Sequence, residues 1–386
     1  MNKNNSKKKI IGLSLFANVG IAEALFSDID VEIKVANEID KKRANFYSEV
    51  YPETNMICGD ITNHNIKDEI INASRDENVN FIIATPPCQG MSEAGKRNEF
   101  DDRNQLITDT IDVIKKVNPD YILIENVPTL LKTKIIVDGK TLLIPEYIKN
   151  ELNHFYNFNE STLIKAMDHG VPQMRQRNIF LMVKKEKQII WEFPKKEPPI
   201  NLRDALSSVP SVDPYLREGI EFTKSKFPNF EFKKEIATSI SKWHSPPTHS
   251  WKHVEWMMYT PSGKSAIYND IYFPKKDNND RIKAHHNNYR RMNWDKPSRT
   301  ITQNNGVISS LCCVHPGHPY KNKYGEILYS DPRVLTIYEL LIVSTLPLNW
   351  PIPEWADETF IRKVIGEGIP SLLVKKIILE LLRKLN

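Results

Sequence analysis

The feature that most constrains the fold is a series of short apolar runs rich in β-branched residues, each ending in a turn or a polar residue. Runs of this length and composition predict buried strands. Apolar residues at helical spacing separate the last two of these strands, at residues 105–117. Strands that alternate with helices indicate an open α/β sheet. The predicted strands in this part of the chain are residues 9–16, 31–38, 56–61, 81–83 and 119–124.

Further elements follow from the same patterns. Thr336 with Glu339 three residues later forms a capping-box pattern, which predicts the start of a helix. Cys58 is expected inside the core of the third strand, and residues 308–314 are expected to form a core strand. The other predicted helices begin at residue 21 or span residues 144–153 and 371–385, and residues 178–183 are predicted to form a strand.

Composition limits the class of protein. The 386 residues are 40% hydrophobic and 26% charged, which is typical of a globular protein of two or three domains. No apolar run reaches the roughly 18 residues that cross a membrane, and no signal-peptide core follows the basic start. The four cysteines show neither zinc-ligand spacing nor a disulfide pattern, so we expect a cytoplasmic protein without a bound metal.

Charge is distributed unevenly along the chain. Residues 184–296 carry 21 Lys and Arg against 14 Asp and Glu, a balance of +7 in a chain whose net charge is +5. Prolines also become frequent after residue 184, which indicates a domain boundary. This basic region is either an ordinary solvated surface or a surface that binds a polyanion.

Residues 84–92, Ala-Thr-Pro-Pro-Cys-Gln-Gly-Met-Ser, follow the fourth predicted strand. Open α/β sheets bind ligands at the carboxyl ends of their strands, which is where Cys88 is expected. A lone cysteine in a turn is more often a small buried residue than a nucleophile. Cys88 therefore needs support from the rest of the chain.

That support comes from polar residues at the ends of neighbouring strands. Glu38 lies 18 residues after Gly20 and ends the second strand, where a carboxylate can accept hydrogen bonds from ribose hydroxyls. Asp60 ends the third strand, and Glu125 follows the fifth. A buried strand that ends in a carboxylate is costly unless the group has a task. For Glu38 the alternative is a surface position.

Gln173, Arg175 and Arg177 alternate along a segment that precedes another strand. In an extended backbone all three point to one side, and the two guanidiniums can orient a polar substrate. The alternative is an edge strand with salt bridges.

With these residues in this order and at this spacing along the chain, the sequence resembles the cytosine-5 DNA methyltransferases of bacterial restriction–modification systems. The resemblance covers nearly the whole chain, and it rests above all on Cys88, Glu125 and Gln173-x-Arg175-x-Arg177. It implies a Rossmann-like, S-adenosylmethionine-dependent methyltransferase domain with a mixed, mostly parallel sheet, and a smaller target-recognition domain. The catalytic domain would comprise residues 1–188 and 357–386, with recognition domain and hinge at 189–356.

The resemblance also implies roles for individual residues. Cys88 would attack C6 of a flipped-out cytosine, Glu125 would bind the N3 edge, and Arg175 or Arg177 would face O2, with Arg175 preferred. The residues implied in cofactor binding are Phe16, Asn18, Gly20, Glu38, Ile39, Asp60, Ile61, Pro86 and Leu106, and those implied in substrate binding are Gln89, Ser92 and Gln173.

Two positions depart from the family pattern. Asn18 and Ile21 stand where the cofactor loop usually has glycines, and Glu367 stands where the last motif usually has asparagine. A glutamate there would repel the carboxylate of S-adenosylmethionine, so Glu367 is left out of the predicted site.

The implied partner is double-stranded DNA, read by residues within 243–291, and the implied state is a monomer that acts beside a cognate endonuclease without a stable complex. Two alternatives stay open: a tRNA cytosine-5 methyltransferase, which the large basic region argues against, and a catalytically silent DNA-binding relative.

Overall fold

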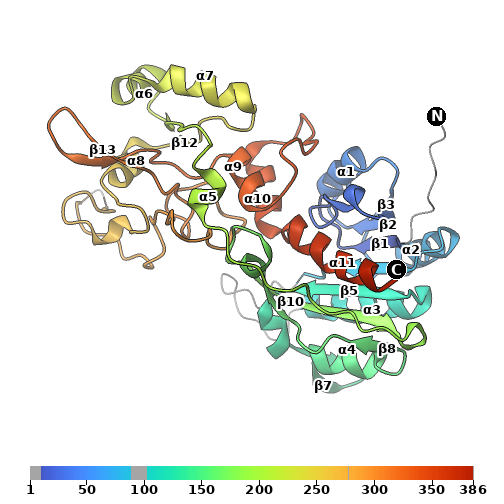
Figure 1. The fold of residues 1–386 in the computed structure, drawn as a ribbon. Coiled ribbons are helices and arrows are strands. Elements are labelled where there is room, and N and C mark those ends of the chain that lie inside the picture. The colour runs from blue at the N-terminus through green and yellow to red at the C-terminus, as the bar shows by residue number, and fades with distance from the viewer. Residues whose placement is uncertain (1–9, 88–101, 277, 386) are drawn as a thin grey trace, which may run out of the picture.

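The protein has two lobes joined by several crossings of the chain (Figure 1). The computed structural model describes residues 10–87, 102–276 and 278–385. Cys88, Gln89 and Ser92 lie outside the described residues. No helix in the described part of the chain is long and apolar enough to cross a membrane.

The first lobe is built on one mixed sheet with the strand order β3-β2-β1-β4-β5-β10-β8, in which β9 also pairs with β10. Neighbours from β3 to β5 are parallel, and the pairs that β10 makes with β5, β8 and β9 are antiparallel. The predicted mixed, mostly parallel sheet is therefore confirmed. The strands are β1 (Ile10–Leu15), β2 (Val31–Glu38), β3 (Asn55–Cys58), β4 (Phe81–Ala84), β5 (Tyr121–Asn126), β8 (Tyr156–Phe158), β9 (Leu163–Lys165) and β10 (Gln176–Lys184).

The strand order reverses at β1. The chain runs from β1 through β2 to β3 on one side, and β4 then returns to the other side of β1. In open α/β sheets, ligands bind in a crevice at the carboxyl ends of the strands at such a switch point. Residues 16–20 after β1 and residues 85–87 after β4 leave the sheet at this point.

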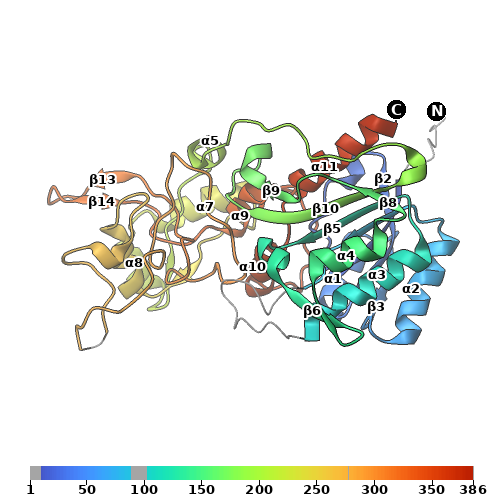
Figure 2. The ribbon, with the colours of Figure 1, turned by 90° about the horizontal axis from the view of Figure 1, so that it is seen from below.

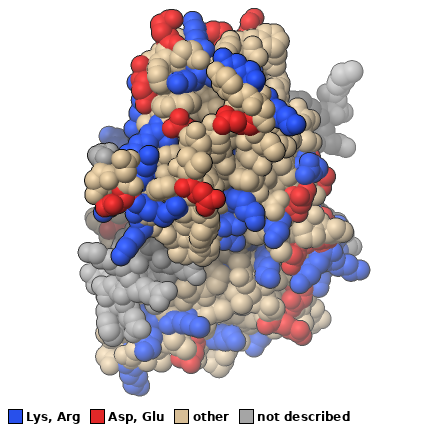
Figure 3. Space-filling model, turned by 90° about the vertical axis from the view of Figure 1, so that its left-hand side faces the viewer, with Lys and Arg blue, Asp and Glu red and all other residues tan. Residues whose placement is uncertain are grey.

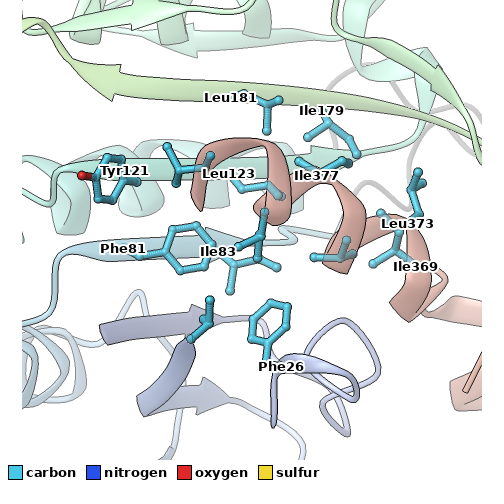
Figure 4. Close-up of a cluster of buried hydrophobic side chains, with 14 of the residues drawn as sticks. Phe26, Phe81, Ile83, Tyr121, Leu123, Ile179, Leu181, Ile369, Leu373 and Ile377 are labelled. Atoms are coloured by element: carbon cyan, nitrogen blue, oxygen red, sulfur yellow. The ribbon is translucent and has the colours of Figure 1, made fainter. Parts of the chain in front are cut away.

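Helices cover both faces of the sheet. On one face, α2 (His64–Asp76), α3 (Leu106–Val117) and α4 (Ile144–Leu152) bury a cluster of aliphatic side chains (Figure 2). On the other face lies α11 (Ser371–Leu385), whose Leu373 and Ile377 pack on Phe81, Leu123 and Leu181 (Figure 4). The predicted amphipathic helix at residues 371–385 is confirmed.

The second lobe has little regular structure. Its elements are α5 (Leu202–Leu206), β11 (Tyr215–Leu216), α6 (Ile220–Lys226), α7 (Phe230–Ile240), β12 (Thr248–His249), α8 (Trp251–Met258), β13 (Pro319–Lys321), β14 (Ile327–Tyr329) and α9 (Ile337–Val343). The chain then returns through α10 (Glu358–Glu367). Thr336 caps α9, and Glu339 completes the predicted capping box.

A buried arginine provides hydrogen-bond donors for backbone carbonyl groups in the irregular parts of this lobe. Arg291 donates hydrogen bonds to the carbonyl oxygens of Met257, His315, Tyr329 and Asp331. Buried carbonyls need such partners where no strand or helix provides them.

Arg333 forms a second buried network, with ion pairs to Asp331 at 2.9 Å and Glu339 at 2.7 Å. Burial opposes ionisation of Glu339, but the Arg333 guanidinium lowers the pKa of that carboxyl to about 2.

Three expectations about local structure are wrong. Residues 21–25 form turns in place of a helix, and they lead to a short 3-10 helix (Phe26–Asp28). The segment must reach β2 at Val31, and its backbone N–H groups bond three residues back, as Phe26 does to Glu23 at 2.8 Å.

Residues 308–312 form turns and a bend, because Cys312 has a left-handed φ of 43° that a strand does not allow. Ile308, Cys312 and Cys313 are nevertheless buried, as expected of core residues. Cys58 is exposed because β3 is an edge strand and Cys58 is its last residue.

Candidate active site

The two turns at the switch point are tied together. Thr85, directly after β4, donates its hydroxyl to the carbonyl of Phe16 at 3.0 Å and its N–H to the carbonyl of Leu15 at 3.2 Å. Phe16 and Asn18 have positive φ angles of 57° and 52°, which non-glycine residues seldom adopt. The loop after β1 is therefore fixed against residues 85–87, which lead toward Cys88 in the sequence.

Glu125 and Arg177 meet at the end of the sheet. Glu125 pairs with Ile179 in the antiparallel register, so Arg177 is its diagonal neighbour on the same face. The Nε of Arg177 lies 2.7 Å from Oε1 of Glu125, and both side chains are about nine-tenths buried. Burial lowers the pKa of Arg177, and the charge of Glu125 opposes that shift. The pair places an oriented carboxyl group beside the end of β4.

Asn126, the neighbour of Glu125, holds the stem of the Cys88 loop. Its Nδ2 donates to the carbonyl of Pro86 at 2.8 Å, and its Oδ1 accepts from the N–H of Val127 at 2.8 Å. Pro86 is two residues before Cys88 in the sequence, so one asparagine couples the strand that carries Glu125 to the segment that leads to the cysteine. The sequence reasoning missed this role, although the adjacent Glu-Asn pair at a strand end was its visible signal.

Arg175 and Gln173 do not share the position of Arg177. Arg175 is buried and donates to the carbonyls of Ile301 at 2.9 Å, Gly366 at 3.1 Å and Glu367 at 2.7 Å. Burial and the neighbouring Arg177 lower the pKa of Arg175.

Gln173 has the same kind of structural role as Arg175. It accepts from the N–H of Ile301 at 3.2 Å and donates to the carbonyl of Val343 at 3.2 Å. The side chains of Gln173 and Arg175 thus connect the segment before β10 to residues 301, 343 and 366–367. The geometry therefore favours Arg177 over Arg175 as the arginine nearest a base held by Glu125, and it assigns Gln173 to the junction between the lobes.

On the other side of the crevice, the predicted cofactor residues surround the ends of β1 to β3. Glu38 is buried, and its two carboxylate oxygens accept from the N–H groups of Asn18 and Asp40, both at 2.9 Å. Each oxygen keeps a lone pair for a ribose hydroxyl. Asp60 is exposed, and its Oδ1 accepts from the N–H of Thr62 at 2.9 Å.

The apolar residues of this crevice also fit a nucleoside. Ile39 leaves 63% of its surface exposed immediately after Glu38, whereas Ile61 is buried. Phe16 and Leu106 are half-buried at the edge of one aliphatic cluster, and Pro86 is buried.

The buried Oδ1 of Asn18 has no hydrogen-bond partner among the described residues. An exposed apolar side chain, acids at the strand ends and an unpaired amide oxygen together suit a ligand that combines an adenine, a ribose and an amino acid. In the described ranges no group of three or more His, Cys, Asp or Glu side chains is arranged to hold a metal.

A family model described as C-5 cytosine-specific DNA methylase matches residues 10–383. The chain belongs to this family. It is a DNA cytosine-5-methyltransferase, and its methyl donor is S-adenosylmethionine.

Two relatives with known names are similar to this chain over almost their whole length. Type II methyltransferase M1.HgaI of Avibacterium volantium is 40% identical over 97% of this chain and 99% of its own. Type II methyltransferase M.NgoPII of Neisseria gonorrhoeae is 32% identical over 95% of this chain and 93% of its own.

Among solved structures, a DNA modification methyltransferase from an Escherichia coli prophage superposes with a TM-score of 0.66 at 21% identity, covering 98% of this chain and 99% of its own. The Dnmt2 methyltransferase of S. pombe gives a TM-score of 0.59 at 17% identity, covering 98% and 100%. These likenesses establish the fold.

Proposed function

We propose that Cys88, Glu125 and Arg177 carry out methyl transfer to a cytosine that has been flipped out of a specific sequence in duplex DNA. The observation that carries this assignment is the Glu125–Arg177 contact of 2.7 Å beside the end of β4. Asn126 supports it by holding the stem of the Cys88 loop at Pro86. Base flipping is required because the reacting atoms of a stacked cytosine are inaccessible.

In the proposed mechanism the Cys88 thiolate forms a bond to C6 of cytosine, and the electron pair of the C5–C6 bond becomes available at C5. Glu125 binds N3 and the exocyclic amine. In its protonated form it supplies a proton to N3 as the enamine forms, and it takes that proton back when the sulfur of Cys88 leaves. Arg177 fixes Glu125 and faces the O2 edge. After C5 has been methylated, loss of the C5 proton restores the double bond and expels the sulfur of Cys88.

S-adenosylmethionine, when bound, supplies the electrophilic methyl group. Among the residues of this chain, Glu38 would bind the ribose, Asp60 the adenine amine, and Phe16, Ile39 and Leu106 the faces of the adenine. Ile61 and Pro86 would support these contacts, and Asn18 and Gly20 would shape the loop after β1. Gln89 and Ser92, which lie outside the described residues, stay proposed substrate contacts.

The second lobe would read the DNA sequence. Figure 3, which faces this lobe, shows many lysine and arginine side chains mixed with acidic ones. Arg299 is exposed and donates to Oδ1 of Asn287 at 3.1 Å. Arg299 follows Ser298, whose carbonyl accepts from the N–H of Met174 at 2.8 Å. Arg299 therefore lies next to the residues that lead into β10, the strand that carries Arg177. Such a position suits contacts to phosphates beside a flipped base.

The biological setting belongs to the same proposal. Two similar proteins are named Type II methyltransferases, and we place this enzyme in a restriction–modification system beside an endonuclease of the same specificity. We propose a cytoplasmic monomer with a catalytic domain of residues 1–188 and 357–386 and a recognition domain and hinge of residues 189–356.

Bisulfite sequencing of DNA from cells that express the protein tests this function, since it reports the activity, the target sequence and the modified base together. Cys88→Ser should abolish methylation and leave binding of S-adenosylhomocysteine unchanged, because a serine hydroxyl is a far weaker nucleophile than a thiolate. Full activity of that variant would overturn the assignment of Cys88.

The two alternatives have separate tests. Methylation of duplex DNA and of tRNA with labelled S-adenosylmethionine, side by side, distinguishes a DNA enzyme from a tRNA enzyme. A duplex that contains 5-fluorocytosine should trap the protein covalently through Cys88. A DNA-binding relative without catalytic activity would form no such adduct.

A further inference from the structure

Glu367, at the end of α10, connects three separate parts of the catalytic lobe. Its Oε2 lies 2.8 Å from an Nη of Arg43 on α1 (Lys41–Val50) and accepts from Nδ2 of Asn18 at 3.1 Å. Its carbonyl oxygen accepts from Arg175 at 2.7 Å. The side chains of Arg43 and Glu367 are mostly buried, with 20% and 24% exposed, so solvent only partly screens the pair.

The two departures from the family pattern therefore meet in space. Asn18 stands where the resemblance implies a glycine, and Glu367 stands where it implies an asparagine. The two side chains bond to each other. The expected repulsion between Glu367 and a cofactor carboxylate is offset, because Arg43 places a positive charge against the same oxygen. The sequence analysis leaves Glu367 out of the predicted site because its charge would repel the cofactor carboxylate, and the sequence does not show that Arg43 lies beside it.

Close packing sets the direction of the Glu367 side chain. A Cβ on Gly366 would lie 2.2 Å from the carbonyl oxygen of Thr302, and a Cβ on Gly368 would lie 2.7 Å from the Ile21 side chain. Glycine is required at both positions for this approach. The backbone on either side of Glu367 is thus held against the cofactor loop and the returning segment, and its carboxylate points at Asn18.

Asn18 also contacts Glu38, the residue proposed to bind the ribose. Its N–H donates to Oε2 of Glu38 at 2.9 Å from a left-handed backbone conformation, φ 52°. Donation of Nδ2 to Glu367 also fixes the orientation of the amide, because the reversed amide would place its oxygen against a carboxylate. The unpaired Oδ1 of Asn18 is then held on the other side of the amide.

We propose that Glu367 and Arg43 are positioning residues for S-adenosylmethionine, holding the Asn18–Glu38 loop in its binding conformation while Arg43 neutralises Glu367 next to the anionic end of the cofactor. This inference rests on the proposed cofactor role of Glu38 and the residue 16–20 loop.

Calorimetric titration with S-adenosylhomocysteine, which needs no turnover, tests the proposal on the full-length protein. Arg43→Ala should raise Kd about five- to tenfold, because it leaves the Glu367 charge uncompensated beside the ligand. Glu367→Gln keeps the bond to Asn18 and should bind normally. The double variant Arg43→Ala/Glu367→Gln should return to within about twofold of the wild-type Kd. Raising the salt concentration should reduce the Arg43→Ala defect.

The matched control is Lys42→Ala, since Lys42 on the same helix pairs with Asp357 of α10 at 3.1 Å but does not contact the cofactor loop. It should leave Kd unchanged. An Arg43→Ala defect that persists in the double variant would overturn the charge argument, and a normal Kd for Arg43→Ala would overturn the proposal. If the wild-type protein bound no S-adenosylhomocysteine, the proposed cofactor site itself would fail.

Discussion

At the scale of single residues, the pair of arginines shows how neighbours with the same chemistry take different roles. Arg177 forms an ion pair with Glu125, whereas Arg175 donates to three backbone carbonyls from returning segments. Their alternation along an extended segment predicts that both arginine side chains point to one side of it. Which groups each guanidinium contacts depends on the segments that pack against that side. Only the tertiary contacts separate a catalytic candidate from a structural one.

The two arginines should respond differently to truncation. Arg177→Ala should lower the single-turnover methylation rate by about a hundredfold or more, because Glu125 loses the partner that orients it. Arg175→Ala should instead lower the free energy of unfolding by about 3 kcal/mol, since three buried carbonyls lose their donor. Rates and urea denaturation of both variants check this, and a reversed pattern would restore Arg175 as the catalytic candidate.

Glu23 is a buried acid behind the cofactor loop. Burial raises its pKa to about 7, although a hydrogen bond with Ser14 opposes the shift. In the unfolded chain the Glu23 carboxyl has its ordinary pKa of 4.5, so folding becomes less favourable as pH rises from 4.5 to 7. Glu23→Gln should therefore stabilise the protein by about 1–2 kcal/mol at pH 8 and hardly at all at pH 5. Glu69→Gln, an exposed acid on α2, is the control and should show no such difference in denaturation.

At the scale of elements, the antiparallel strand β10 lies against β5 and brings Arg177 to the end of an otherwise parallel array. The end of β5 in turn positions two groups, because Glu125 faces Arg177 and Asn126 holds Pro86. Side chains two apart on paired strands share a face, and successive residues on one strand do not. One strand end can therefore supply a catalytic group and a structural clamp from adjacent residues.

Loss of the clamp should affect catalysis more than cofactor binding. Asn126→Ala should reduce kcat by about ten- to a hundredfold, because the Cys88 loop loses its anchor, with the Kd of S-adenosylhomocysteine unchanged. Asn159→Ala is the control: this buried asparagine bonds to Ile179 and Leu181 of the same sheet, away from the loop. Both variants should lose about 1–2 kcal/mol of stability. Equal kcat values for the two would show that the clamp has no catalytic consequence.

At the scale of the whole molecule, the lobes are joined by polar contacts and by apolar packing. Residues 173–175 bond to residues 298–301, and α10 packs its Ile361 and Ile365 in one cluster with Val19 and Ile21 of the cofactor loop. The second lobe is stabilised by buried charges more than by strands. Its stability should therefore depend on pH more strongly than its size alone would suggest.

Two buried histidines set the direction of that dependence. Burial lowers the pKa of His315 to about 4 and that of His249 to about 3. Both remain neutral in the folded protein where the unfolded chain takes up protons, so stability is complete above pH 6.5 and falls as pH decreases toward 4. We expect a loss of about 2–3 kcal/mol per histidine over that range.

The histidine prediction can be checked by chemical denaturation at several pH values. His315→Asn should flatten the pH dependence, while His318→Asn should not, because His318 is exposed and its ring stacks on Trp294. A profile of His315→Asn parallel to that of the wild type would show that His315 does not contribute to acid sensitivity.

The sequence by itself determined the sheet, the helix at residues 371–385, the family and the order of the site residues, because these depend on local periodicity and on residue types at strand ends. The sequence did not predict the turns at residues 21–25 and 308–312, because the left-handed backbone of Cys312 and the short return to β2 overrode local preference. Only the tertiary structure decided that Arg177 and not Arg175 faces Glu125 and that Arg43 lies beside Glu367. Those partners are far apart along the chain, and charge pairing between distant segments leaves no periodic signal in a single sequence.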